Sequence, residues 1–354
     1  MIGTIERVDA ELDVTTEERE ALVQALTRRG FMAAAAAVAA LGAGGVAAQS
    51  TPTAEAPAAF TYTDATGQGI ELAEIPKRIV ATSGMLLALW DLGIQAIGCL
   101  GAAPSDEDRT TVYARVDVER VTYLVADPTT WEIDMEALVA LDPDLVIAEY
   151  DAPTSSFFGF GNEQQLTRNV QTFAPLLGFD YTGSVPEVLQ RTMDLATALG
   201  VSADSEQAHQ AVTAFTDAAD TVKRAIAANP DLKIGRLSMA EDGSTVSFGK
   251  TAGMNDLAYL KELGATIVEG PGDGQWWSDD VSVELLPTFP LDLIVIGIYE
   301  DPQVFADSAV YQTLPAVKAG QIGTIKTFPA LSHLVYAEVL IAFAELISTS
   351  DVVA

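Results

Sequence analysis

The chain has 354 residues, a hydrophobic content of 49%, a mean hydropathy of +0.23 and a formal net charge of −31. Its length is typical of two domains that each bury a core, and its hydrophobic content excludes disorder over most of the chain. The charge excludes nucleic acid as a partner, because phosphate binding requires clustered Lys and Arg, and it disfavours adhesion to anionic lipid. The single cysteine, Cys99, excludes an internal disulfide and a Cys-rich zinc site, and its apolar surroundings predict a core residue.

Residues 27–48, "TRRGFMAAAAAVAALGAGGVAA", have the pattern of an export signal. The pair Arg28-Arg29 precedes an Ala-rich, weakly hydrophobic run that ends in small residues. We therefore expect residues 1–48 to direct export by the twin-arginine route to the periplasm or the extracellular face of the cytoplasmic membrane. The signal is either cleaved or retained as an anchor. Residues 49–59 form a Pro/Ala/Thr linker, and the chain from residue 49 onward keeps 15 basic and 43 acidic residues, so the acidity belongs to the exported part.

Residues 60–182 alternate between strand and helix patterns and predict a first α/β lobe. The stretch "FTYTDATGQGIEL" predicts a hairpin around Gly67 and Gly69. A buried strand over residues 79–82 is followed by a helix in "GMLLALWDLG". The later run "DLVIA" is uniformly apolar, which is typical of a parallel strand covered by helices on both faces. A further short strand is expected in "FDYTG", residues 179–183.

Residues 183–230 carry apolar residues at helical spacing without a strand pattern, and they predict two connecting helices with a break near Gly200. Residues 231–354 then predict a second α/β lobe. Its strands are expected in "LKIGRLSMA", "TIVEG", "LDLIVIGIY" and "IGTIKTF", and its helices in "MNDLAYLKELGA", "SVELLPTFP" and "HLVYAEVLIAFAELIS". The predicted fold class is α/β, with two lobes of mainly parallel sheet.

One unit occurs twice, as "MEALVALDPDLVIAEYD" at residues 135–151 and "VELLPTFPLDLIVIGIYED" at residues 283–301. In each copy a Glu stands eight positions before an Asp that opens an apolar run. The pairs are Glu136 with Asp144 and Glu284 with Asp292. Ligands of open parallel sheets bind beyond the carboxyl ends of the strands, so we expect Glu149, Tyr150 and Tyr299 near a site. The alternative is that both Tyr residues only cap their strands.

Five stretches, in this order, resemble the substrate-binding proteins of ABC importers for iron-siderophores, haem and cobalamin. They are "TYTDATGQGIELAEIPKRIVA", "IDMEALVALDPDLVIAEYD", "LAYLKELGATIVEG", "VSVELLPTFPLDLIVIG" and "YQTLPAVKAGQIGTI". They are spread from residue 61 to residue 325, and the resemblance extends over most of residues 60–350. The resemblance implies lobes joined by a long backbone helix, as in helical-backbone metal receptors, with a shallow cleft between them. It also implies capture of a ferric siderophore and delivery to an ABC permease, without catalysis. We expect a monomer and no cofactor other than the Fe(III)-siderophore cargo.

The resemblance further implies that one exposed acidic residue on each lobe docks onto the permease. The family pattern has a Glu on the helix after the first strand, whereas this chain has "MLLALWDLG" there. Asp91 is the nearest acidic residue, and Asp256 is the expected counterpart in the second lobe. Both could equally be ordinary surface residues.

Site candidates are aromatic or polar residues at loop positions after strands, and a glycine among them lets a backbone approach a ligand closely. The Trp residues precede the helices of the two doubled units, where they suggest flat apolar walls for a chelate or macrocycle, although any of them could instead belong to a core. The candidates are Ser83, Gly84, Met85, Trp131, Glu149, Tyr150, Ser247, Phe248, Trp276, Trp277, Tyr299 and His333.

Charge narrows the cargo only slightly. A strongly anionic ferric catecholate needs several basic contacts, whereas a neutral or cationic ferric hydroxamate is easier to accommodate, although Arg236 could supply one positive contact. Bare ferric iron coordinated by Tyr150, Tyr299 and His333 is an alternative, as are haem and cobalamin. No "GxSxG" or "GxxxxGK[ST]" motif is present, so neither a hydrolase nor a nucleotide enzyme is expected.

Overall fold

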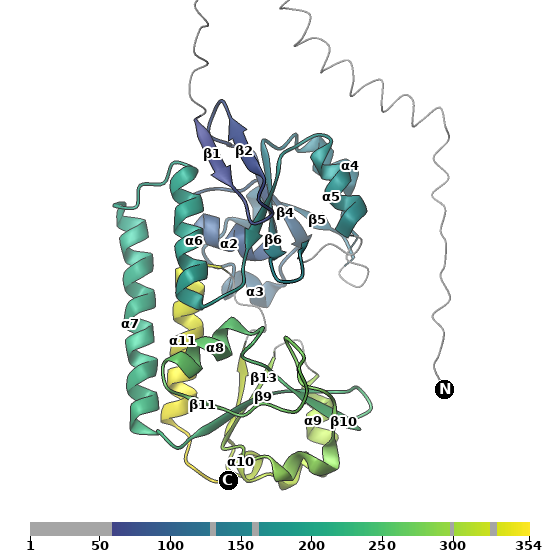
Figure 1. Ribbon diagram of the computed structural model, residues 1–354, viewed down its shortest axis with the longest axis vertical. Coiled ribbons are helices and arrows are strands. Elements are labelled where there is room, and N and C mark those ends of the chain that lie inside the picture. The colour runs from purple at the N-terminus through teal and green to yellow at the C-terminus, as the bar shows by residue number, and fades with distance from the viewer. Residues whose placement is uncertain (1–58, 128–131, 158–162, 298–300, 326–330) are drawn as a thin grey trace, which may run out of the picture. The chain divides into compact units, whose positions relative to one another are not determined.

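The computed structural model describes residues 59–127, 132–157, 163–297, 301–325 and 331–354, without the side chains of residues 163–166. Residues 57–354 form one compact unit (Figure 1). The expected export signal lies outside the described residues. The boundaries expected between the lobes stay predictions.

The described chain begins with a β-hairpin formed by β1 (Phe60–Thr63) and β2 (Gly69–Leu72). Asp64 organises the turn, because its carboxylate accepts hydrogen bonds from the backbone N–H groups of Thr66 and Gln68 at 3.0 and 2.9 Å. Its other oxygen accepts from the N–H of Gly178 at 2.8 Å, which ties the hairpin to the first lobe. The predicted hairpin is confirmed.

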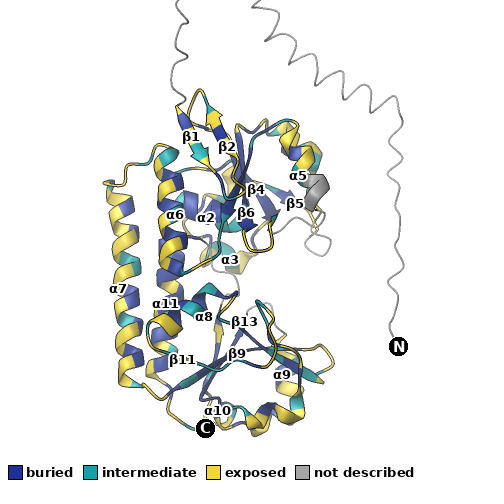
Figure 2. Ribbon diagram, in the orientation of Figure 1, coloured by how far each residue is buried: buried dark blue, intermediate teal, exposed yellow. Residues whose placement is uncertain are grey.

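In the described part of the chain, the first lobe contains a six-stranded sheet with the order β5-β4-β3-β6-β7, and β8 pairs with β6. All its pairings are parallel except β6 with β7. The strands are β3 (Ile79–Ala81), β4 (Gly98–Ala102), β5 (Thr122–Val125), β6 (Leu145–Asp151), β7 (Ser156–Phe157) and β8 (Leu176–Asp180). The helices are α2 (Ser83–Asp91), α3 (Asp106–Thr110), η1 (Val118–Arg120), α4 (Met135–Ala140) and α5 (Glu163–Gln171). The central strands are buried on both faces, as their apolar sequences predict (Figure 2).

The described residues of the second lobe also form a six-stranded sheet, ordered β12-β10-β9-β13-β14, with β11 paired to β9. Its core strands are parallel, whereas β10 and β12 add an antiparallel edge. The strands are β9 (Lys233–Met239), β10 (Thr245–Phe248), β11 (Thr266–Ile267), β12 (Val281–Ser282), β13 (Leu293–Gly297) and β14 (Ile322–Ile325). The helices are α8 (Asn255–Glu262), η2 (Val283–Thr288), α9 (Pro302–Asp307), η3 (Tyr311–Thr313) and α10 (Pro315–Lys318). The predicted α/β class with mainly parallel sheets is confirmed.

Three long helices complete the fold: α6 (Val185–Ala198), α7 (Glu206–Ala228) and α11 (His333–Ser348). The break expected near Gly200 lies between α6 and α7, and Gly200 has a φ of 93°, which favours glycine. Helix α7 packs along α11 (Figure 1). Buried alanines such as Ala211, Ala218 and Ala344 line these helices, so their backbones can approach closely.

Asp144 and Asp292, at equivalent points of the doubled unit, make equivalent contacts. The N–H of Asp144 donates to the carbonyl of Arg78, and its carboxylate accepts from the N–H groups of Lys77 and Arg78, each at 2.9 Å. The N–H of Asp292 donates to the carbonyl of Lys233, and its carboxylate accepts from the N–H of Lys233, both at 2.9 Å. Each Asp thus joins the start of its own strand to the start of the neighbouring parallel strand. The sequence repeats because this junction is built twice.

The short helix expected in "SVELLPTFP" is present as a 3₁₀-helix over residues 283–288. Two other elements differ from the sequence expectations. Strand β8 begins at Leu176, three residues before the expected stretch "FDYTG". The antiparallel edge of the second sheet was not expected, since β10 and β12 have only four and two residues.

The two aspartates differ in burial, and this difference predicts unequal stability losses. Asp292 is fully buried and also accepts from the N–H groups of Val353 and Ala354, each at 2.7 Å, whereas Asp144 is exposed. An asparagine has only one acceptor oxygen, so Asp292→Asn leaves buried donors unsatisfied. We expect Asp292→Asn to lower the free energy of unfolding by about 3 kcal/mol and Asp144→Asn by about 1 kcal/mol in urea denaturation. Equal losses would contradict the junction as described.

Candidate ligand-binding site

Residues of the two lobes meet beyond the carboxyl end of β8. The side-chain amide of Asn255, the first residue of α8, donates to the carbonyl of Tyr181 at 2.8 Å. The ring of Tyr181 lies 6.1 Å from that of Trp276, at an interplanar angle of 32°. All three residues are partly exposed, so two aromatic surfaces are available to a ligand at this junction.

Glu149, near the end of β6, caps helix α2 from another element. Thr82 precedes α2 but makes no side-chain cap, and its hydroxyl instead donates to Glu149 Oε1 at 3.2 Å. The N–H groups of Gly84 and Met85 also donate to the Glu149 carboxylate. A carboxylate suits this position, because the first N–H groups of a helix lack partners within it and carry a partial positive charge.

Burial outweighs these hydrogen bonds and raises the pKa of Glu149 from 4.5 to about 7. The titratable groups that face it are Cys99, Tyr181 and Tyr336, and burial raises the pKa of all three, that of Cys99 to about 12. They are therefore neutral near pH 7. Glu149 as a whole residue is partly exposed, although its carboxylate is largely enclosed by α2 and its neighbours.

The other candidates after β3 serve the first lobe itself. A Cβ at Gly84 would overlap Oε1 of Glu149, so the missing side chain makes room for this carboxylate rather than for a ligand. Ser83 lies 3.4 Å from the sulfur of Cys99 and hydrogen-bonds to Tyr113. Met85 is fully buried in the core, behind the site rather than in it, and Cys99 is buried as predicted.

Tyr150 and His333 lie in separate packing environments. Tyr150 is buried in the first lobe, with its ring 5.0 Å from that of Phe157 at 64°. His333 is buried at the start of α11, edge-on to Phe215 of α7 at 6.0 Å, and burial lowers its pKa from 6.5 to about 4. Tyr299, the third expected ligand of bare iron, lies outside the described residues. Among the residues that the structure describes, no three His, Cys, Asp or Glu side chains are grouped to hold a metal ion.

In the second lobe, the candidates divide between surface and core. Ser247 is partly exposed and donates to Asp280 at 2.8 Å. Phe248 is fully buried with its ring 4.5 Å from that of Phe289, so it belongs to the core and does not form a wall of the site. Trp277 is partly exposed and pairs through its backbone with Gly249. Trp131, expected at the corresponding point of the first lobe, lies outside the described residues.

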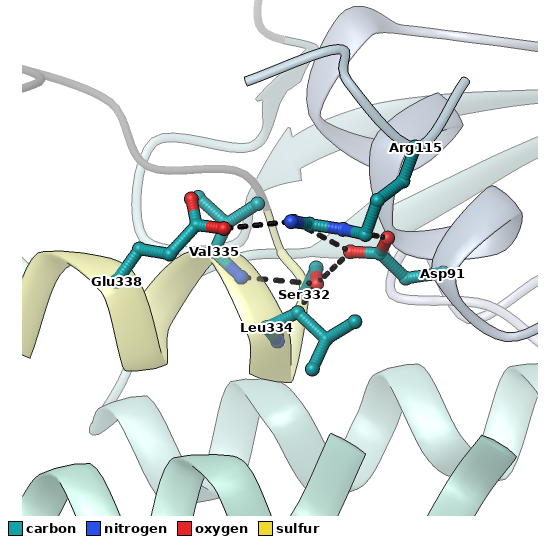
Figure 3. A network of polar contacts seen from close by, with 6 residues as sticks. All are labelled: Asp91, Arg115, Ser332, Leu334, Val335 and Glu338. Atoms are coloured by element: carbon teal, nitrogen blue, oxygen red, sulfur yellow. Dashed lines mark hydrogen bonds and ion pairs between the residues drawn. The ribbon is translucent and has the colours of Figure 1, made fainter. Parts of the chain in front are cut away.

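Asp91 takes part in a network that joins the first lobe to α11 (Figure 3). Its side chain is only 4% exposed, and it accepts from Arg115 Nε at 2.7 Å and from the hydroxyl of Ser332. Arg115 also pairs with Glu338 at 2.6 Å, and Ser332 caps α11 by accepting from Leu334 and Val335 N–H groups. The expectation that Asp91 is an exposed docking residue is corrected, because its carboxylate is already bound.

Asp256, the docking residue expected on the second lobe, is buried and forms an ion pair with Arg236 at 2.9 Å. Burial raises the pKa of Asp256, although Arg236 favours the ionised form. Arg236 is itself fully buried, so it is not an exposed positive contact for a ligand. Both expectations are corrected for the same reason: each charge is the buried partner of the other.

Tyr181, Asn255 and Tyr336 were not among the residues expected at the site. Tyr181 was placed inside a predicted strand, and Asn255 was seen only as the start of a helix. With β8 correctly bounded at Asp180, Tyr181 becomes the first residue beyond a strand end, which is the signal used for the other candidates. Tyr336 lies inside an apolar helix and gives no such signal.

Two surface hollows among the described residues lie on the long helices instead. One, of about 570 Å³, runs between α7 and α11 and includes Arg115, Asp217 and Glu338. The other, of about 550 Å³, follows the start of α7 and includes Asp204 and His209. Neither is lined by a Phe, Tyr or Trp side chain, so neither offers the flat apolar wall that a chelate requires.

The sequence profile of a family described as periplasmic binding protein matches residues 99–327. The chain belongs to the periplasmic binding protein family. Among solved structures, DesE, a ferric-siderophore receptor protein from Streptomyces coelicolor, is 25% identical to this periplasmic binding protein with a TM-score of 0.73. That match covers 83% of this chain and 100% of DesE. No curated protein matches the chain significantly.

Two further solved structures share the fold of this periplasmic binding protein. The siderophore periplasmic binding protein from the fuscachelin gene cluster of Thermobifida fusca is 20% identical, with a TM-score of 0.56 and coverage of 77% of this chain and 96% of that one. FhuD from Vibrio cholerae, solved with Fe3+-Desferal, is 18% identical, with a TM-score of 0.56 and coverage of 78% and 99%. Within the described residues, no helix has the length and apolarity needed to span a bilayer.

The raised pKa of Glu149 predicts a pH-dependent stability. The folded protein holds this proton up to a pH of about 7, whereas the unfolded chain releases it near 4.5. The contribution of Glu149 to stability is therefore present below pH 4.5 and lost as the pH rises through about 7. Replacing Glu149 with Gln should remove this loss. The difference in unfolding free energy, variant minus wild type, should therefore become more positive as the pH rises from 5 to 8. The exposed Glu284→Gln serves as control, and a parallel pH profile for Glu149→Gln and wild type would count against the assignment.

His333 predicts a dependence of the opposite sign. The neutral, buried imidazole has a pKa of about 4, below the ordinary value of 6.5, so its contribution is present above pH 6.5 and lost as the pH falls through about 4. His333→Gln should therefore reduce the acid-induced loss of unfolding free energy between pH 6.5 and 4. The matched control is His209→Gln on the exposed face of α7, which should leave the profile unchanged. The idea fails if both histidine variants have the same profile.

Proposed function

We propose that this protein captures a ferric siderophore outside the cytoplasm and delivers it to the permease of an ABC importer. The observation that carries the proposal is the match to DesE, a ferric-siderophore receptor protein, over 83% of this chain and all of DesE. Membership of the periplasmic binding protein family supports a role as the ligand-binding component of a transport system. Such a role requires an ABC permease as partner. Export by the twin-arginine signal at residues 27–48 is part of the same proposal.

The junction of Tyr181, Asn255 and Trp276 supports a chelate as the cargo. Two partly exposed rings from different lobes offer apolar surface, and the amide of Asn255 holds the lobes together beside them. Such a combination of flat apolar surface and a few polar groups suits an organic chelate better than a bare ion.

The charge of the protein favours a neutral or cationic complex. The chain has a net charge of −31, so its long-range field repels a strongly anionic ferric catecholate. In the described chain, Arg236 already pairs with Asp256 and Arg191 with Asp180, while Lys250 donates to the carbonyls of Gly270 and Gly272. We therefore propose a ferric hydroxamate as the cargo class.

A ligand panel tests the proposal. Quenching of tryptophan fluorescence is measured with a ferric trihydroxamate, a ferric tricatecholate, haem, cobalamin and ferric citrate. We expect saturable quenching by the trihydroxamate at the lowest concentration. Tighter binding of haem or cobalamin, or no binding of any ferric siderophore, would overturn the proposed function.

Trp276→Ala should weaken binding of the ferric trihydroxamate about tenfold, because loss of one aromatic contact removes roughly 1 to 1.5 kcal/mol. The control is Trp90→Phe, since Trp90 is partly buried in α2 and its indole N–H donates to the carbonyl of Ala96. Titration calorimetry measures both variants against wild type. Unchanged affinity in Trp276→Ala would remove this side chain from the site.

A further inference from the structure

Glu149 is a carboxylate without a cationic partner at the end of a strand in the first lobe. Its hydrogen bonds come from the hydroxyl of Thr82 and from the N–H groups of Gly84 and Met85, all of them uncharged donors. A carboxylate offers about four acceptor positions, so these three donors leave room for one more. The residue is also partly exposed, so a ligand group can reach it.

Among the described residues, none of the titratable side chains that face Glu149 supplies the missing positive charge. The side chains that face Glu149 from β4, from the end of β8 and from α11 are Cys99, Tyr181 and Tyr336, and none of them is basic. Helix α2 carries no basic residue in its last turn and no acidic residue in its first turn. Three guanidinium groups of the described chain pair with other carboxylates. Arg191 pairs with Asp180, Arg236 with Asp256, and Arg115 with Asp91 and Glu338.

We infer that Glu149 is a specificity-determining residue that accepts an alkylammonium group of the cargo, so that the protein prefers a ferric hydroxamate carrying this cation over the same chelate without it. The inference rests on the proposed function, since it assigns the charge of the ligand in the same site. An ammonium is the natural complement here, because it donates up to three hydrogen bonds and compensates the charge at once.

The aromatic residues beside Glu149 favour the same ligand group. Tyr181 interacts electrostatically with Glu149, and its ring lies 6.1 Å from that of Trp276. Cations are attracted to the faces of such rings. Tyr181 also donates to Asp151 at 3.4 Å, which adds a second acidic group on the same side. A negatively charged ligand group would meet the carboxylates of Glu149 and Asp151 at this point. Lys250, the basic residue next to Trp276 in the described chain, donates from its Nζ to the carbonyls of Gly270 and Gly272 instead.

A matched pair of ligands tests the inference. The ferric complex of desferrioxamine B ends in a primary ammonium, and its N-acetyl derivative keeps the chelate but loses the charge. Titration calorimetry at pH 8 measures both against wild type, Glu149→Gln and, as control, the exposed Glu136→Gln. We expect wild type and Glu136→Gln to bind the ammonium form about tenfold more tightly, and Glu149→Gln to bind both forms equally.

The readout is the ratio of the affinities for the ammonium form and the N-acetyl form. If loss of the α2 cap in Glu149→Gln weakens the binding of both forms equally, this ratio does not change. Glu149→Asp, which keeps the charge on a shorter side chain, should retain part of the preference. Equal binding of both forms by wild type, or an undiminished preference in Glu149→Gln, would overturn the inference while leaving the proposed function intact. Failure of wild type to bind either form would overturn the proposed function itself.

Discussion

The carboxylate of Asp91 joins the first lobe to the start of α11, and the geometry of the site depends on this contact. Asp91 is the last residue of α2, where a negative charge is unfavourable with respect to the helix dipole. Arg115 offsets that cost, and the hydroxyl of Ser332 binds the same carboxylate while it caps α11 (Figure 3). One acidic side chain therefore determines where the second lobe's last helix begins relative to the first lobe.

Helix α2 links this contact to Glu149. Its first turn is capped by Glu149 from β6, and its last residue binds the cap of α11. Tyr336, one turn into α11, faces both Glu149 and Asp256. The carboxylates of the two lobes thus share a buried tyrosine. A displacement of α2 would move the cap of α11 and the carboxylate of Glu149 together.

Much of the fold follows from the sequence, because the spacing of apolar residues indicates which faces of a helix or strand are buried. The uniformly apolar runs that became β6 and β13 identified parallel strands, and Gly200 marked the break between α6 and α7. The site was harder to predict, because the partners of its charged side chains lie far away in the chain. Asp91 binds Ser332, 241 positions later, and Asp256 binds a residue inside a strand. No local pattern distinguishes such a carboxylate from one on the surface.

Gly84 was expected near the site and does lie beside a site residue, but the reason given for a glycine at this position was wrong. A glycine after a strand suggests close approach of a ligand to the backbone, and the position does lie beside a candidate site residue. The space left by the missing side chain is filled by the carboxylate of Glu149, 65 positions further on. Only the three-dimensional contact shows whether a small residue makes room for a ligand or for the protein itself.

In the doubled unit, the strand starts serve the fold and are alike, whereas the residues near the strand ends differ between the two copies. With Asp144 aligned to Asp292, the two copies make equivalent hydrogen bonds at the starts of β6 and β13. Five residues later the copies differ, since Glu149 in the first corresponds to Gly297 in the second. The strand starts are alike because each must join its neighbour in a parallel sheet. Glu149, which caps α2 and interacts with Tyr181 of the candidate site, has a glycine at the aligned position of the second copy, so recognition through this carboxylate is a property of the first copy alone.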